Sequence, residues 1–257
     1  MTKKWSQCAR NSERPEAELL VKVEMADTRE VWGVIGTGTI TSAVVTGALT
    51  SPAFKDRVRF VVSPRSAAKA EALAAQFPDS ITIAESNQAV VDAAKTCLVG
   101  VLPKQAEEVL SAIKFDAGSH VLLSLMAIVP STALAKHTGL PASSVFRCIP
   151  LPSVANHSGV TILSPESATF HELFDALGGC VVARDDHELS VLMTVSCTMG
   201  PFYYTLKTMS DFVASQGVDP ATASKFVGGT YLGIAKDAHG KCGDPAGFEE
   251  LIAEQTP

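Results

Sequence analysis

Several features that would place this chain in other protein classes are absent. No apolar run reaches the roughly 18 residues that a membrane-spanning helix needs. The six cysteines include no C-x-x-C pair, and the six histidines form no H-x-x-x-H set. Neither a zinc site nor a disulfide framework is therefore indicated. Scattered cysteines are typical of proteins of the reducing cytoplasm, where we expect this protein to act.

Runs of basic residues are scarce as well. The formal net charge is −6 at pH 7, and no cluster of lysine and arginine is longer than Lys3-Lys4. A protein that binds a phosphate backbone needs several basic contacts close together. We therefore expect no nucleic acid and no membrane among the partners of this chain.

The composition fits a globular protein of up to two domains. Of the 257 residues, 46% are hydrophobic and 19% are charged, which is enough apolar surface to bury a sizeable core. Residues 1–29 are more polar and lack the apolar segment of a secretory signal. We predict a peripheral N-terminal arm over 1–29. Alternatively, translation starts at Met25 and residues 1–24 are an extension.

One stretch, VWGVIGTGTITSA, has the pattern of a strand, a tight turn and the start of a helix. A first glycine, Gly36, allows positive φ in the turn, and a second, Gly38, lets the backbone approach a pyrophosphate. The phosphates would then meet the free N–H groups of Thr39, Ile40 and Thr41. Thr41 stands where the G-x-G-x-x-G fingerprint has its third glycine, so the motif needs support from its context.

The rest of the chain supplies that context. Helices are predicted over 39–49, 67–77, 87–94, 105–113, 130–137 and 169–177, and later strands over 58–62, 81–84, 96–102, 120–125, 145–148, 159–163 and 180–183. Only helices follow, over 187–216 with a break at Gly200-Pro201, over 220–239 and over 245–254. Such alternation is typical of a parallel sheet with helices on both faces. We predict an α/β fold with a Rossmann-type domain over 30–184 and an all-helical domain over 185–257.

The end of the second predicted strand indicates which dinucleotide is bound. NAD-selective proteins place an acidic residue there, which accepts hydrogen bonds from the ribose 2′-hydroxyl. This chain has Ser63, Arg65 and Ser66 and no acid. An arginine and two hydroxyls can hold a 2′-phosphate, so NADPH is favoured, with NADH possible. The alternative is that Arg65 is a solvated loop residue.

The helical segment is more apolar than a small domain needs. Large apolar residues recur along it: Phe202, Leu206, Met209, Phe212, Val213, Phe226, Val227, Leu232 and Ile234. About 70 residues form only a marginal core, and helices with such apolar stripes usually meet a partner. We predict a homodimer, or a higher homo-oligomer, through these helices. The alternative is a helical cap folded back on its own sheet.

The order of these motifs resembles the pyrroline-5-carboxylate reductase family from Val31 onward. The matching stretches are the glycine turn with Ala43, the turn from Ser63 to Ser66, Asn87 before V-V-D-A-A, Arg147 and Pro150 in R-C-I-P, Gly200-Pro201 with Tyr203, and T-Y-L-G-I-A-K from Thr230 to Lys236. The resemblance implies an N-terminal domain that binds NAD(P)H and a C-terminal helical domain that dimerises. It also implies the reduction of a cyclic imine, 1-pyrroline-5-carboxylate, to proline.

The resemblance further implies where the substrate lies. Thr230 would face the imine and hydrogen-bond its ring nitrogen as the catalytic residue, and Met199, Gly200 and Pro201 would contact the substrate. Hydride transfer to C=N needs a donor near the nitrogen, which a hydroxyl can supply. Without the resemblance, Thr230 is better interpreted as a structural threonine bonded to the carbonyl four residues earlier.

On the cofactor side, the resemblance assigns Asn87 to the ribose next to the adenine. It places Leu102, Pro103 and Ala127 near the nicotinamide. Together with the turn and the Arg65 loop, these residues complete the predicted dinucleotide site.

Two loops depart from the family where the substrate should lie. The glycine-serine-glycine-proline-alanine loop is Thr198–Phe202 here, and M-P-N-T-P becomes Ile149–Pro152. Family members also continue past the position of Pro257, so we expect a divergent and C-terminally truncated member. The alternatives are an NADPH-dependent imine or ketone reductase with a more apolar substrate, and a non-catalytic dinucleotide-binding dimer.

Overall fold

The computed structural model describes residues 27–255. Most of the predicted N-terminal arm, and the proposed start at Met25, lie outside these residues. The three arm residues inside them run along the sheet: the guanidinium of Arg29 donates to the Asp79 carbonyl at 2.6 Å and to Ser80 Oγ at 2.7 Å. These bonds attach the beginning of the described chain to the segment before the third strand.

The first region is an eight-stranded sheet with the order β3-β2-β1-β4-β5-β6-β7-β8. The strands are β1 (Glu30–Ile35), β2 (Val58–Val62), β3 (Ile81–Ile83), β4 (Thr96–Val99), β5 (Val121–Ser124), β6 (Val145–Ile149), β7 (Thr161–Ser164) and β8 (Cys180–Val182). The predicted parallel alternation is confirmed from β1 to β6.

The last two strands, β7 and β8, run against the first six. β7 pairs antiparallel with β6, with Cys148 opposite Leu163. The connection between them holds only the short 3-10 helix η3 (Pro152–Asn156), and a parallel return would need a crossover of a dozen or more residues. An α-helix separates β7 from β8, which are parallel again.

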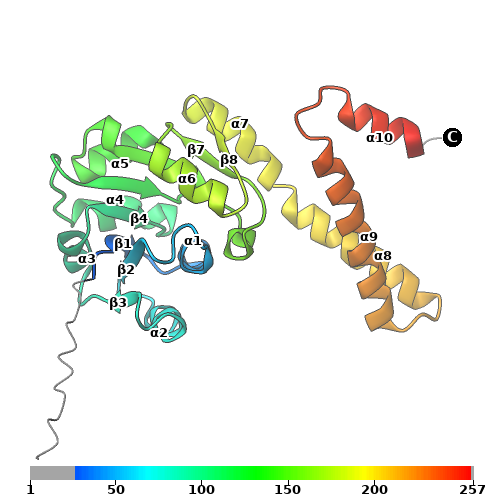
Figure 1. Cartoon of the computed structure of the whole chain (residues 1–257), viewed down its shortest axis with the longest axis horizontal. Helices are drawn as coiled ribbons and strands as arrows, with labels where there is room; N and C mark the ends of the chain where they lie inside the picture. Colours follow the sequence, from blue (N-terminus) through cyan, green and yellow to red (C-terminus); the bar gives the residue numbers. More distant parts are fainter. Residues whose placement is uncertain (1–26, 256–257) are drawn as a thin grey trace, which may run out of the picture.

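Helices cover both faces of this sheet (Figure 1). They are α1 (Thr39–Thr50), α2 (Ala67–Gln76), α3 (Asn87–Ala93), α4 (Ala106–Ser111), α5 (Ser131–Thr138) and α6 (Ala168–Ala176), with the 3-10 helices η1 (Pro103–Gln105) and η2 (Ala142–Ser144). Side chains of α1, α2 and α6 share one apolar core, and those of α3, α4 and α5 share the other.

Alternating side chains of the central strands pack into these two cores. Trp32 and Val34 enter the first core, whereas Ile35 enters the second, as the two-residue period of a strand requires. Trp32 is 1% exposed and meets the rings of Phe54 and Phe60 edge-on. The sheet region therefore has a complete interior of its own.

The second region is helical and extends away from the sheet (Figure 1). It comprises α7 (Asp186–Ser196), α8 (Met199–Ser215), α9 (Pro220–Gly240) and α10 (Gly247–Gln255). The predicted break at Gly200-Pro201 was misplaced, because the chain bends earlier, at Cys197 and Thr198. Pro201 lies in the first turn of α8, where its missing N–H costs no helical hydrogen bond.

Only the first of these helices caps the sheet. Leu189 of α7 is buried against Ile149 and Ala183, whereas α8 packs along α9. No helix between residues 27 and 255 combines the length and apolar character needed to cross a membrane.

Candidate dinucleotide site

A cavity of about 470 Å³ lies where the central strands end. Its walls come from the segments that follow the first five strands, β1 to β5. The chain passes from β1 to β2 and β3 on one side and then returns to β4 on the other side. In open parallel sheets such a reversal leaves a crevice outside the carboxyl ends of the strands, where ligands bind.

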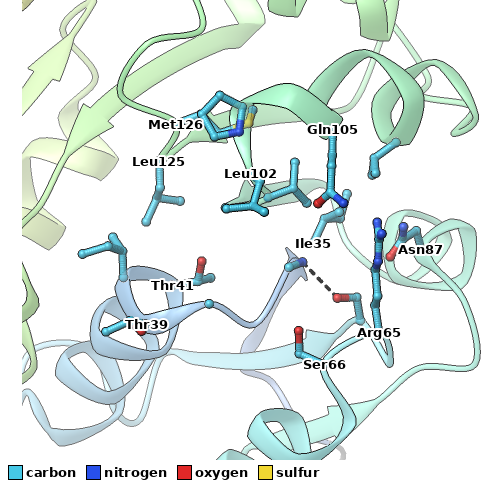
Figure 2. A pocket seen from close by; sticks show the side chains of 18 of the residues that line it. Ile35, Thr39, Thr41, Arg65, Ser66, Asn87, Leu102, Gln105, Leu125 and Met126 are labelled. Atoms are coloured by element: carbon cyan, nitrogen blue, oxygen red, sulfur yellow. Dashed lines mark hydrogen bonds between the residues drawn. The ribbon is translucent and has the colours of Figure 1, made fainter.

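All the residues predicted to contact the cofactor line this one cavity. They are Gly36, Gly38, Thr39, Ile40, Ser63, Arg65, Ser66, Asn87, Leu102, Pro103 and Ala127. Figure 2 shows Arg65 and Asn87 on one side of the cavity and Leu125 and Met126 on the other, with Thr39 and Thr41, at the start of α1, below Leu125. The structure thus brings these residues together, while their role as cofactor ligands stays a prediction.

The glycine turn has the geometry that its sequence predicts. Gly36 has a φ of +91°, and a Cβ there would lie 2.9 Å from the Gly100 carbonyl oxygen. The Gly36 N–H donates to Ser63 Oγ at 2.9 Å (Figure 2). Ser63 therefore fixes the turn with its oxygen, and its hydroxyl proton is left to donate to a ligand.

Thr41 replaces the third glycine of the fingerprint without loss of close packing. A Cβ on Gly100 would lie 2.0 Å from Thr41 Oγ1, so the glycine that provides the space is on the loop after β4. Thr41 is 1% exposed, and its hydroxyl has no hydrogen-bond partner in the described structure although it lines the cavity. Buried hydroxyls are nearly always bonded, so this one fits a ligand oxygen or an ordered water.

The end of the cavity that contains Arg65 suits an anion. Arg65 is exposed and makes no ion pair with any residue from 27 to 255, and none of the lining residues is acidic. A 2′-phosphate would find the guanidinium, the Ser66 hydroxyl and the Asn87 amide within one wall. The residues present therefore fit a phosphorylated dinucleotide.

Several lining residues were not predicted. Gly100 and Val101 join the cavity because β4 ends at Val99 and not at residue 102 as predicted. Gln105 of η1 and Met126, which follows β5, join it as well. The available signal was that these residues follow strands whose carboxyl ends meet at one edge of the sheet.

The described lining lacks the titratable side chains that most often act as general acids. It contains no Asp, Glu, His, Cys, Lys or Tyr. Cys97 lies in the sheet, where burial raises the pKa of its thiol to about 12. No group of three His, Cys, Asp or Glu within residues 27–255 is arranged to hold a metal ion.

Residues 31–128 match the model of a family described as NADP oxidoreductase, coenzyme F420-dependent. Among solved structures, the pyrroline-5-carboxylate reductase of Streptococcus pyogenes superposes with a TM-score of 0.72 at 20% identity, covering 90% of this chain and 86% of that one. The chain has the pyrroline-5-carboxylate reductase fold. No curated protein sequence is significantly similar to it.

Other structures with this fold carry nicotinamide cofactors. The Plasmodium falciparum pyrroline carboxylate reductase with NADP bound gives a TM-score of 0.72 at 15% identity, covering 90% of this chain and 85% of that one. A reductive aminase from Aspergillus terreus, in complex with NADPH and ethyl levulinate, gives 0.60 at 21% identity, covering 89% and 77%. At these identities the likeness establishes the fold, with its Rossmann-like domain and long C-terminal helices.

The residues predicted to meet the substrate are not at the cavity of their own chain. Met199 lines a separate apolar cleft of about 380 Å³ beside β7, β8 and α7, and Gly200 and Pro201 are exposed. Thr230 is exposed on α9, where its hydroxyl donates to the Phe226 carbonyl at 2.9 Å. A single chain thus shows the structural alternative for Thr230, and its catalytic role stays a prediction.

Proposed function

We propose that this chain is an NADPH-dependent reductase of cyclic imines, with 1-pyrroline-5-carboxylate as the substrate to be tested first. The observation that carries the proposal is the cavity at the carboxyl edge of the sheet. It joins a glycine turn, an unpartnered buried hydroxyl on Thr41 and an unpaired Arg65, and it contains no acid. Solved structures of the same fold hold NADP or NADPH.

This chain's residues would hold the cofactor from end to end. The N–H groups at the start of α1 would bind the pyrophosphate, since the first N–H groups of a helix lack acceptors inside it. Arg65 and Ser66 would bind the 2′-phosphate, and Asn87 the adenine-side ribose. The nicotinamide would lie against Leu102, Pro103 and Ala127. When bound, NADPH supplies the hydride that reduces the imine carbon.

The substrate half of the site would come from a second copy in a homodimer. The hairpin of α8 and α9 projects from the sheet (Figure 1) and exposes large apolar side chains, among them Tyr204 at 72% and Phe226 at 69%. Contiguous apolar surface of this kind marks an interface. Docking of the hairpin on the partner would bring Thr230 to the partner's cavity, where its hydroxyl could donate to the imine nitrogen.

A more apolar imine or ketone is the second candidate. The cleft that contains Leu151 and Met199 has an almost entirely aliphatic lining, and an apolar pocket favours a substrate without a carboxylate. The absence of Asp, Glu, His, Cys, Lys and Tyr from the described lining supports a third candidate, a dinucleotide-binding dimer without catalysis.

One assay tests the cofactor assignment and a second separates the three candidates. Fluorescence titration should show tight NADPH binding that Arg65→Ala weakens by about 1.5–3 kcal/mol, the range of a hydrogen bond to a charged group, with little effect on NADH. Arg184→Ala, which removes an exposed arginine outside the cavity, is the control. Equal losses for both nucleotides would overturn the 2′-phosphate assignment.

The second assay follows NADPH oxidation with pyrroline-5-carboxylate and with cyclic imines that lack the carboxylate. Turnover of the carboxylate substrate supports the first candidate. Turnover of apolar imines alone supports the second, and binding without any turnover supports the third.

A further inference from the structure

Arg147 of β6 is the only charged residue among residues 27–255 that is buried, at 3% exposure. Burying an ion is costly unless it is paired and hydrogen-bonded. The proposed binding of a cofactor does not itself need an arginine beneath this part of the sheet.

The guanidinium has two partners from different parts of the chain. Nη1 donates to Asp186 Oδ1 at 2.5 Å, and Nη2 donates to the carbonyl oxygen of Ala127 at 2.8 Å. The other Asp186 oxygen accepts from the Ser131 backbone N–H at 2.9 Å and from Ser131 Oγ at 2.8 Å. Burial tends to raise the pKa of Asp186, but the hydrogen bonds from Arg147 and Ser131 outweigh it and hold that pKa below its ordinary value.

These partners connect the cavity to the helical region. Ala127 lines the cavity on the loop after β5, at the end assigned to the nicotinamide. Ser131 is the first residue of α5, and Asp186 is the first residue of α7, which leads to α8 and α9. One planar guanidinium therefore fixes the position of the Ala127 carbonyl relative to the start of the helical region.

We propose that Arg147 and Asp186 are positioning residues, which hold the Ala127 loop in the shape that accepts the nicotinamide end of the cofactor. The inference rests on the proposed function, because it presupposes that a dinucleotide lies in the cavity. Lysine cannot replace Arg147, since a single ammonium does not reproduce two N–H groups aimed at two fixed acceptors. The other end of the cavity, at Arg65, receives no contact from the pair.

This difference between the two ends gives the test. Arg147→Lys and Asp186→Asn should raise the dissociation constant of NADPH by about 10- to 100-fold, the usual effect of losing the support behind a binding group. Adenosine 2′,5′-bisphosphate, which lacks the nicotinamide half, should bind within about twofold of the wild-type affinity, because its contacts lie at the Arg65 end.

The exposed ion pair of Arg57 and Glu172 is the matched control. Its two bonds of 2.6 and 3.2 Å also join distant segments, but neither residue lines the cavity. Arg57→Lys should leave both affinities unchanged. If Arg147→Lys or Asp186→Asn does not fold, Ser131→Ala, which removes one hydrogen bond to Asp186, is measured in its place.

A purely structural role predicts a different pattern. Equal weakening of both ligands, or no weakening of either in a folded variant, would overturn the positioning role and leave the proposed function standing. Wild-type protein that binds neither ligand would overturn the proposed function, and this inference with it.

Discussion

In the sheet region, Trp32, Phe54 and Phe174 are at most 1% exposed, whereas Tyr204, Phe212 and Phe226 of the helical region are 62% to 72% exposed. Within α7 to α10 the buried residues are few: Leu189, Ala223, Val227 and Gly247. Aromatic side chains are thus buried in the core of the sheet region and exposed on the helical region.

The difference indicates what each region can do alone. The sheet region encloses two apolar cores and carries the cavity, so in our account a single chain binds the dinucleotide. The helical hairpin leaves its apolar face uncovered, and in our account a second copy covers it and completes the site. The predictions below test this division, beginning with the largest expected effect.

The same substitution in both regions should have very different costs. Phe174→Ala should lower the free energy of unfolding by about 3–5 kcal/mol, because it leaves a cavity in a closed core. Phe212→Ala should change the unfolding of the sheet region by less than about 0.5 kcal/mol. Urea denaturation followed by tryptophan fluorescence gives both values, and similar costs would contradict the division.

A charge on the helical face should separate the subunits. Phe226→Glu should weaken self-association by about 3 kcal/mol, or roughly 100-fold, since a central aromatic residue can dominate an interface. Ile83→Glu, on the edge strand β3, is the control and should leave association unchanged. Sedimentation velocity over a range of protein concentrations measures both, and a monomeric wild-type protein would contradict the proposed interface.

Within the sheet region, the contact between Gly100 and Thr41 can be tested by rescue. Gly100→Ala should cost about 1–3 kcal/mol, because its methyl group would collide with Thr41 Oγ1. In the Thr41→Ala background the same change should cost much less. Equal costs in both backgrounds, measured by urea denaturation, would show that the two residues do not share this space.

The smallest expected effect is the pH dependence of the link between the regions. The pKa of Asp186 is lowered in the folded protein, so its contribution to stability is complete above the pKa of the unfolded chain and is lost as the pH falls. The stability difference between the wild type and Asp186→Asn should therefore shrink below about pH 4. Asp186 is partly exposed, and the change will be modest. A constant difference from pH 7 to pH 3 would exclude this linkage.

Much of the sheet region could be predicted because local patterns determine it. β2 has the predicted bounds, and β1 and α1 flank a glycine turn whose residues specify its geometry. The cavity residues could be predicted because parallel strands bring their carboxyl ends to one edge. The contribution of Gly100 could not be predicted. Glycine is required there because any side chain would collide with Thr41 Oγ1, and Thr41 is distant in sequence.

The helical region was less predictable. Its helices could be placed from periodicity, but the bend at Cys197 came before the expected glycine-proline pair because a proline fits the first turn of a helix. The reversal of β7 depends on the length of one connection and not on its own residues. In our account, the place of Thr230 relative to the substrate depends on how a second copy docks, which no local pattern specifies.

The most direct measurement is complementation between two inactive variants. Gly38→Leu should fold, since a Cβ there meets nothing closer than the Gly100 oxygen at 3.6 Å, and its larger side chain would fill the phosphate site. Thr230→Ala should bind NADPH but turn over poorly. If each site combines the cavity of one chain with Thr230 of the other, equal mixtures should recover about a quarter of wild-type imine reduction. No recovery in mixtures that form mixed dimers would contradict the shared site.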